Sequence, residues 1–302
     1  MTKKRRLAYL ALITTAIIWG STGAVAKGTF SALNPAQFLY FRYLLATLIS
    51  FPYLIYLLIK LKPKLKTLWS IILLEGLAIP LPLLMLYEGV YRTSAVEASL
   101  IGATSPIFTV LGGIIFLRER ETRREWQGLA ISFLGTLILV AEPLLMMTNG
   151  TITYSLSGNL MVIGYNIFWT LYCLLAKKLY KKIPKVLVTA LAFPIYAIIF
   201  TLYILISHNP LPSLSILTTS SHLSISMLYM VVMSSFIAGT LYIWGQDKIE
   251  ASEASVFTYL QGIVAIPVAF LLLGETPSPI AYLAIIVIAL GVYRAESRVN
   301  QH

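Results

Sequence analysis

Charged residues are scarce in this 302-residue sequence, where Asp, Glu, Lys and Arg together make up 12% of the chain. A soluble domain carries about twice that share, so the composition excludes an ordinary soluble protein. The sequence contains a single cysteine, Cys173, and a single aspartate, Asp247. One cysteine leaves no partner for an intramolecular disulfide.

The groups used in enzyme chemistry are equally scarce. A metalloenzyme needs grouped histidine and carboxylate ligands, whereas His208, His222 and His302 are scattered over predicted loops and the C-terminus. One aspartate cannot form the aspartate cluster that binds magnesium in many transferases. The sequence has no glycine-rich phosphate loop. It also has no histidine within an apolar segment that could act as the base for Ser21 or Ser105. We therefore expect no enzyme, catalytic residue, metal, cofactor or nucleotide.

Long apolar runs dominate what is present. The chain is 58% hydrophobic and has a mean hydropathy of +0.82. About 20 helical residues cross a hydrocarbon core roughly 30 Å thick. Ten runs reach or approach that length, at about 7–27, 36–59, 68–89, 95–117, 126–142, 157–176, 186–207, 224–245, 252–273 and 279–294. They predict an all-α polytopic membrane protein with ten transmembrane helices in a lipid bilayer.

The basic residues are distributed unevenly along the chain, which has a net charge of +11. With the N-terminus in the cytoplasm, cytoplasmic segments would hold 20 of the 23 Lys and Arg residues. The positive-inside rule then predicts a multi-pass protein of the cytoplasmic (inner) membrane with both termini in the cytoplasm. Charge here reports topology and indicates no nucleic-acid partner. The first apolar run is too long for a secretory signal, and we interpret it as an uncleaved first helix.

The two halves of the chain resemble each other in sequence. At an offset of 156, ten of the 47 positions between Gly89 and Gly135 are identical. They include the glutamates of VEAS (96–99) and SEAS (252–255). The first spans align at an offset of 150, which pairs Trp19 with Trp169 and Lys27 with Lys177.

The repeat indicates a pair of related domains. We interpret 1–150 and 151–302 as five-helix repeats, and because five is odd the second is inverted in the membrane. Inverted repeats suit a carrier that exposes one central site to each side in turn. The sequence also allows a second interpretation, in which the protein is a channel.

Several motifs carry a family resemblance: Trp19-Gly20-Ser21, Arg42, Ser105-Pro106, FLRE followed by Trp126-Gln127-Gly128, Pro267 with LLLGE, and Gly135 and Gly291. In this order they resemble the drug/metabolite transporter superfamily, specifically its EamA-type members, over almost the whole chain. The resemblance implies a secondary transporter, often an exporter of amino acids or other small metabolites. Ala284 stands where the pattern has a glycine opposite Gly128, which we interpret as a packing substitution.

Two charges inside predicted spans break the symmetry of the halves. Arg42 and Glu75 lie well inside spans 2 and 3, where a charge costs at least ~2.5–3.5 kcal/mol and needs a partner or a cavity. Arg42 could form a structural ion pair with Glu88 or Glu97, or anchor a substrate carboxylate. Glu75 could snorkel to the interface, bind a substrate ammonium group or carry a coupled proton.

The repeated glutamates favour structural roles. Glu97 follows Ser94 in a capping-box pattern, and Glu253 would occupy the first turn of its helix, where a carboxylate is favoured. We expect Glu119 and Glu275, which end their helices, to be solvated or paired with a loop. The repeated glycines are expected to allow close helix approach.

A predicted site follows from the polar and aromatic residues at mid-depth. An aromatic pocket with few hydrogen-bonding groups suits an amphipathic solute. The expected function is export of small amphipathic metabolites, foremost amino acids, across the membrane. Cationic drugs, nucleosides or sugars, and channel-like facilitation, are the alternatives. We predict substrate contacts from residues on a frame of spans 1, 2, 3, 4, 6, 8 and 9: Trp19, Arg42, Glu75, Ser105, Asn166, Trp169, Ser235, Tyr259 and Gln261.

Overall fold

The computed structural model describes residues 3–112, 115–116, 123–142, 152–208, 210–249 and 257–296. These residues form helices and their connections, and no strand occurs among them, so the predicted all-α class is confirmed. Within the described ranges, seven helical stretches are long and apolar enough to cross a membrane, and three shorter apolar helices accompany them. Glu119 and Glu253 lie outside the described residues.

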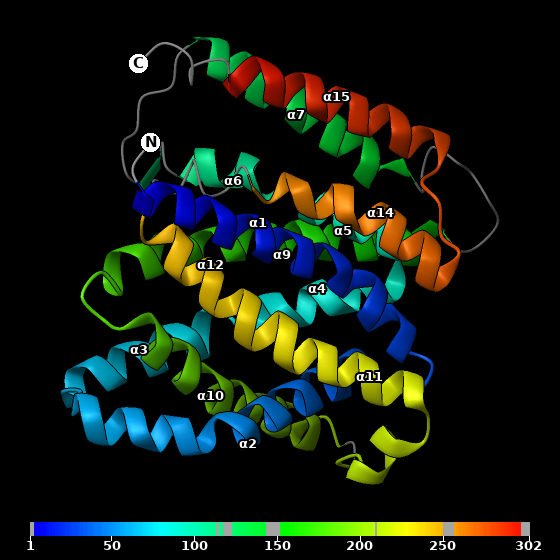
Figure 1. Cartoon of the computed structure of the whole chain (residues 1–302). Coiled ribbons are helices and arrows are strands. Elements are labelled where there is room, and N and C mark those ends of the chain that lie inside the picture. Colours follow the sequence, from blue (N-terminus) through cyan, green and yellow to red (C-terminus); the bar gives the residue numbers. More distant parts are fainter. Residues whose placement is uncertain are drawn as a thin grey trace.

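The helices are distributed along the whole chain (Figure 1). In chain order they are α1 (Lys3–Thr29), α2 (Pro35–Leu61), α3 (Leu65–Ala78), α4 (Pro80–Arg92), α5 (Ala95–Gly102), α6 (Ser105–Gly112), α7 (Arg123–Val140), α9 (Ile152–Leu179), α10 (Lys185–Ile206), the short 3₁₀ helix η2 (Leu214–Thr218), α11 (Ser221–Tyr229), the π-helix η3 (Met230–Ala238), α12 (Gly239–Gln246), α14 (Tyr259–Leu273) and α15 (Pro279–Glu296).

Local sequence signals fix two helix starts. Asn34 and Gln37 form a reciprocal capping box at the start of α2. Ser94 caps α5 by accepting a hydrogen bond from the Glu97 backbone N–H at 2.9 Å, as predicted. The Glu97 carboxylate does not complete that box and accepts a bond from the Thr93 hydroxyl at 2.7 Å.

Three of the long apolar segments are interrupted part-way through. The helix is interrupted at Ile79, between α3 and α4. Pro80, which follows, has no N–H group with which to continue the helical hydrogen bonds. A second break at Ala103–Thr104 separates α5 from α6. The third segment stays helical but changes type, because η3 is a nine-residue π-helix between α11 and α12. Such π-helical insertions are rare and occur frequently at functional sites.

Helices α7 and α15 pack side by side at one edge of the molecule (Figure 1). A Cβ at Gly135 would lie 3.0 Å from the Ile288 nitrogen and 3.1 Å from the Ala284 oxygen. A Cβ at Gly291 would lie 2.6 Å from the Gly128 oxygen. The predicted close approach at these glycines is confirmed, and Ala284, which replaces the expected glycine, is fully buried in the same crossing.

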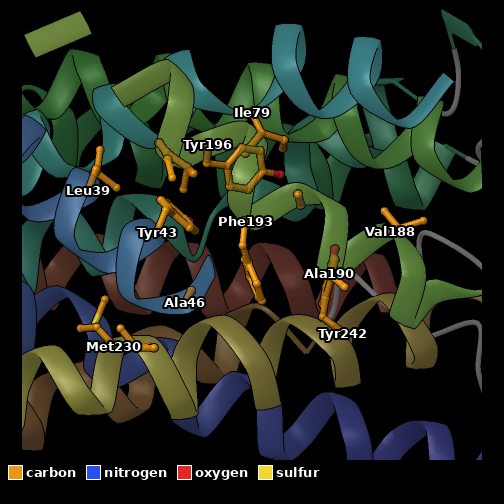
Figure 2. Close-up of a cluster of buried hydrophobic side chains, with 14 of the residues drawn as sticks. Leu39, Tyr43, Ala46, Ile79, Val188, Ala190, Phe193, Tyr196, Met230 and Tyr242 are labelled. Atoms are coloured by element: carbon orange, nitrogen blue, oxygen red, sulfur yellow. The ribbon is translucent and has the colours of Figure 1, made fainter. Parts of the chain in front are cut away.

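A buried apolar cluster joins helices from both halves of the chain (Figure 2). Tyr43 of α2 stacks on Phe193 of α10 at 6.4 Å between ring centroids and meets Tyr196 edge-on at 4.9 Å. Phe193 in turn contacts Phe236 of η3 at 4.6 Å. This cluster packs α2, α10 and η3 together and forms one wall of the site described next.

Candidate substrate-binding site

A central cavity of about 170 Å³ lies where the interrupted helices meet. Its walls include Ile79 at the α3–α4 break, Gly102 and Ser105 at the α5–α6 break, and Ser234 and Gly239 in and just after the π-helix. Irregular backbone inside a membrane is tolerated where it lines a cavity or is buried in protein. The three interruptions therefore share one location, the wall of this cavity.

Most of the predicted contact residues line the cavity. Asn166 and Tyr259 are not among the lining residues. The Asn166 side chain is fully buried and donates to the Ile101 carbonyl at 2.8 Å, which ties α9 to α5, and Tyr259 is half-buried at the first residue of α14. Helix α10, which the predicted frame of spans omitted, contributes Phe193 and Tyr196 to the wall. The seven predicted residues that do line the cavity are Trp19, Arg42, Glu75, Ser105, Trp169, Ser235 and Gln261.

Arg42 is 5% exposed, and its hydrogen-bonding partners are neutral groups. Its Nε donates to the Ser235 hydroxyl at 2.8 Å, Nη1 to the Tyr87 hydroxyl at 2.6 Å, and Nη2 to the Ser234 hydroxyl at 2.9 Å. The guanidinium carbon lies 5.2 Å from the centre of the Tyr43 ring, within range of a cation–π contact. Each Nη nitrogen carries a second N–H group, and neither of these has a partner among the described residues.

The glutamates that could have neutralised Arg42 have other partners. Glu88 pairs with Arg92 one turn further along α4, at 3.4 Å. Glu97 accepts a bond from the Asn159 amide at 3.2 Å. The alternative of a structural ion pair between Arg42 and either glutamate is therefore not realised. The charge of Arg42 borders the cavity with no carboxylate paired to it in the described part of the chain.

Glu75 is 1% exposed, so its carboxylate does not snorkel to an interface. Three tyrosine hydroxyls donate to it: Tyr172 at 3.0 Å and Tyr180 at 2.8 Å on one oxygen, and Tyr196 on the other. These donors come from the second half of the chain, in and next to α9 and in α10. Among the described residues, no Lys or Arg forms an ion pair with Glu75.

Aromatic rings connect the walls of the cavity. Trp19 and Trp169, which are paired in the sequence repeat, meet edge-on at 5.9 Å, and Tyr242 contacts the two rings at 4.9 Å and 5.8 Å. The Trp19 indole donates to the Ser234 carbonyl at 3.1 Å. That bond fixes α1 to the π-helix beside the serine hydroxyls that hold Arg42.

Sequence reasoning missed most of the hydroxyl groups around both charges. Tyrosine is common in this sequence, with 18 residues, so composition alone could not single out those that matter. The available signal was the buried charge itself, because such a charge requires polar partners nearby. The missed residues are Tyr87 and Ser234 beside Arg42, and Tyr172, Tyr180 and Tyr196 beside Glu75.

One ion-pair cluster lies at the ends of two membrane-spanning helices. Asp247, just after α12, contacts Lys185 at 3.0 Å and Lys248 at 2.8 Å. Partial burial would raise the pKa of Asp247, but the hydrogen bonds and charges of the two lysines outweigh it and hold the pKa below its ordinary value. The cluster fastens the start of α10 to the end of α12.

Long apolar helices of this kind define a polytopic membrane protein, and its helices enclose a cavity with buried charges and aromatic walls. The sequence model of the EamA-like transporter family matches residues 6–141 and again residues 156–295. The chain belongs to the EamA-like transporter family.

Similar proteins are of comparable length. An uncharacterized transporter of Archaeoglobus fulgidus is 23% identical over 97% of this chain and 98% of its own length. The uncharacterized transporter YdfC of Bacillus subtilis is 26% identical over 94% of this chain and 89% of its own. A probable amino-acid metabolite efflux pump of Salmonella typhimurium is 24% identical, with 96% and 94% covered. One crystal structure of a protein matches 99% of this chain and 100% of its own with a TM-score of 0.69 at 17% identity, which shows a common fold.

Proposed function

We propose that this protein is a secondary carrier that exports amino acids across the cytoplasmic membrane by alternating access. One observation carries the proposal: a buried cation, Arg42, and a buried carboxylate, Glu75, line the same cavity and do not pair with each other. The Tyr43 and Tyr196 rings, whose centroids lie 4.9 Å apart, connect the two charges, since Tyr43 contacts Arg42 and Tyr196 donates to Glu75.

This arrangement suits the chemistry of a free amino acid. The remaining N–H groups of Arg42 suit a substrate carboxylate, because guanidinium groups bind carboxylates with two parallel hydrogen bonds. Glu75 is the complementary group for the substrate ammonium. The rings of Trp19 and Trp169 suit an apolar side chain, and their faces also attract a cation. The Salmonella relative, a probable amino-acid metabolite efflux pump, adds support from a distant sequence.

Alternating access suits a protein whose two halves can exchange conformations, and contacts that recur in both halves support such a relation. Gly89 packs on Val162, and its counterpart Gly245 packs on Leu12, which lies 150 positions before Val162. The α7–α15 crossing shows the same relation. Gly135 contacts Ile288 and Gly291 contacts Ser132, and the offset of 156 relates Gly135 to Gly291 and Ser132 to Ile288. In this proposal ten spans form two inverted five-helix repeats, 1–150 and 151–302.

The proposed topology places both termini in the cytoplasm, on the same side as the basic loop between α2 and α3. In a Cys173→Ser background, Lys64→Cys is then labelled by an impermeant maleimide in inside-out vesicles only. Ser213→Cys, in the loop after α10, is labelled in right-side-out vesicles only. The reverse pattern would contradict the orientation.

The substrate is tested with purified protein in liposomes loaded with the twenty amino acids. We expect saturable release of a chemically coherent subset, measured by mass spectrometry, and exchange of labelled substrate between the two sides. No release above protein-free liposomes would reject amino acids and direct the search to cationic drugs, nucleosides or sugars. Release that neither saturates nor exchanges would indicate a channel-like facilitator.

A further inference from the structure

Helix α5 is a half-helix of eight residues, Ala95–Gly102, with an unusual connection at each end. At its C-terminal end, α5 is separated from α6, which begins at Ser105, by Ala103 and Thr104. Between its ends, Ala98 and Ser99 line the central cavity. The half-helix therefore forms part of the cavity wall and is joined to the rest of its span by a two-residue turn.

The N-terminal end of α5 is held by a side chain from the other half of the protein. Glu275, just after α14, accepts hydrogen bonds from the backbone N–H groups of Ala95 at 2.7 Å and Val96 at 3.2 Å. A carboxylate at this position satisfies N–H groups that have no partner inside the helix and favours the positive end of its dipole. Gly274, at φ 69°, ends α14 in the left-handed conformation, so that Glu275 follows directly after the turn.

Lys27, near the end of α1, completes the connection. Its ammonium group lies 3.2 Å from the second Glu275 oxygen and donates to the Thr93 carbonyl, just before α5. Glu275 is therefore paired with the start of α5 and with Lys27 near the end of α1, and not with a loop as expected. The two side chains are 26% and 20% exposed, so solvent screens them only in part. Charge-assisted hydrogen bonds of this kind are about twice as strong as neutral ones.

We propose that α5 is the outer gate of the cavity, hinged at Ala103–Thr104 and held closed by a latch of Glu275 and Lys27. The inference rests on the proposed carrier function and topology, which place this end of α5 at the outer face. The latch joins the two halves, because Lys27 and α5 belong to the first and Glu275 to the second. Opening requires Glu275 to release the α5 backbone, so solute reaches the cavity from outside only when the latch is broken.

The second half carries a counterpart of one latch contact. Lys177 donates to the Ile249 carbonyl at 3.0 Å, as Lys27 donates to the Thr93 carbonyl. The offset of 150 relates the two lysines, and the offset of 156 relates the two carbonyl residues. In the inverted arrangement this second contact lies at the inner face. Weakening it shifts the population toward the inward-open state, which is the opposite of weakening the outer latch.

The test measures access to the cavity without needing a substrate. In a Cys173→Ser background, Ser99→Cys reports on the α5 wall through its labelling rate with an impermeant maleimide added outside right-side-out vesicles. We expect Glu275→Gln and Lys27→Gln each to raise this rate roughly tenfold, and Lys177→Gln to lower it. Glu88→Gln is the matched control and should leave the rate unchanged, because the ion pair of Glu88 lies within α4.

Two results would overturn the latch. One is an unchanged rate in both Glu275→Gln and Lys27→Gln when the proteins elute as single species from a sizing column. The other is an equal rise in all four variants, which would indicate general loosening. A positive labelling result without amino-acid release keeps the gate and rejects the proposed substrate. Amino-acid release with unresponsive labelling rejects the gate alone.

Discussion

At the scale of single residues, the cavity holds its two charges through neutral partners. Arg42 donates to three hydroxyl groups that cannot neutralise it, and Glu75 accepts bonds from three tyrosines. A buried charge is stabilised by hydrogen bonds together with an opposite charge, and the structure supplies these residues with the hydrogen bonds. The opposite charges are what a zwitterionic substrate would bring.

The role of Arg42 is tested by two substitutions of different severity. Arg42→Gln removes the charge and should raise the KM for amino-acid transport by roughly tenfold to a hundredfold, since bonds to charged groups contribute ~1.5–3 kcal/mol. Arg42→Lys keeps the charge but loses the planar fork, so an intermediate KM is expected. Transport kinetics in liposomes provide the measurement, with Arg92→Gln as the control at a partly exposed arginine. An unchanged KM in Arg42→Gln would reject the carboxylate anchor.

Glu75 is tested separately for proton coupling. Glu75→Gln keeps the shape of the side chain but cannot take up or release the proton. If Glu75 carries the coupled proton, the variant should lose transport driven by a pH gradient and keep counterflow exchange without a gradient. Tracer uptake with and without the gradient distinguishes these activities. Equal loss of both would count against coupling and leave Glu75 as a substrate ligand.

At the scale of helices, the molecule combines tight crossings with interrupted segments. Small residues let α7 and α15 approach closely, as expected where lipid offers no hydrophobic drive for helix association. The breaks at Ile79 and Ala103–Thr104 and the π-helix η3 depart from regular α-helix where they border the cavity. Regular, closely packed helices therefore support irregular segments that present polar groups to the cavity.

The close α7–α15 crossing predicts that the stability of the protein depends strongly on its glycines. In Gly291→Ala the new Cβ would meet the Ser132 nitrogen at 2.5 Å and the Gly128 oxygen at 2.6 Å, and backbone atoms cannot move aside easily. Overpacking of this kind costs about 1–3 kcal/mol, so thermal unfolding in detergent should shift to lower temperature. Gly102→Ala is the control, because its methyl group would point into open space. Equal unfolding temperatures in the two variants would contradict the packing argument.

The ion-pair cluster between α10 and α12 predicts a pH-dependent contribution to stability. Because Lys185 and Lys248 lower the pKa of folded Asp247, the stabilisation is fully present above the unfolded pKa of about 3.9 and is lost as pH falls through the lower folded pKa. Asp247→Asn should lower the free energy of unfolding at pH 7 by up to about 1 kcal/mol, since the pair is partly exposed. Unfolding measured from pH 7 to pH 3 should show the difference shrinking, and a constant difference would exclude the charge as its cause.

At the scale of the whole molecule, architecture and site differ in how far the sequence could predict them. Apolar length and scarce charge predicted helices long enough to cross a membrane, and the structure has seven such helices among its described residues. The same reasoning selected Arg42 and Glu75, which both line the central cavity. It did not find the shift to a π-helix at Met230–Ala238, because an apolar composition suits a π-helix and an α-helix equally.

The helical membrane class and the two charges that need partners could be read from the linear chain, because the length of an apolar run and an isolated charge are properties of neighbouring residues. The groups around those charges could not. Ser235 stands 193 positions from Arg42, and Tyr172 stands 97 positions from Glu75. Many serines and tyrosines in this chain could donate or accept such bonds, and the packing of the helices selects the few whose hydroxyl groups lie within reach of each charge.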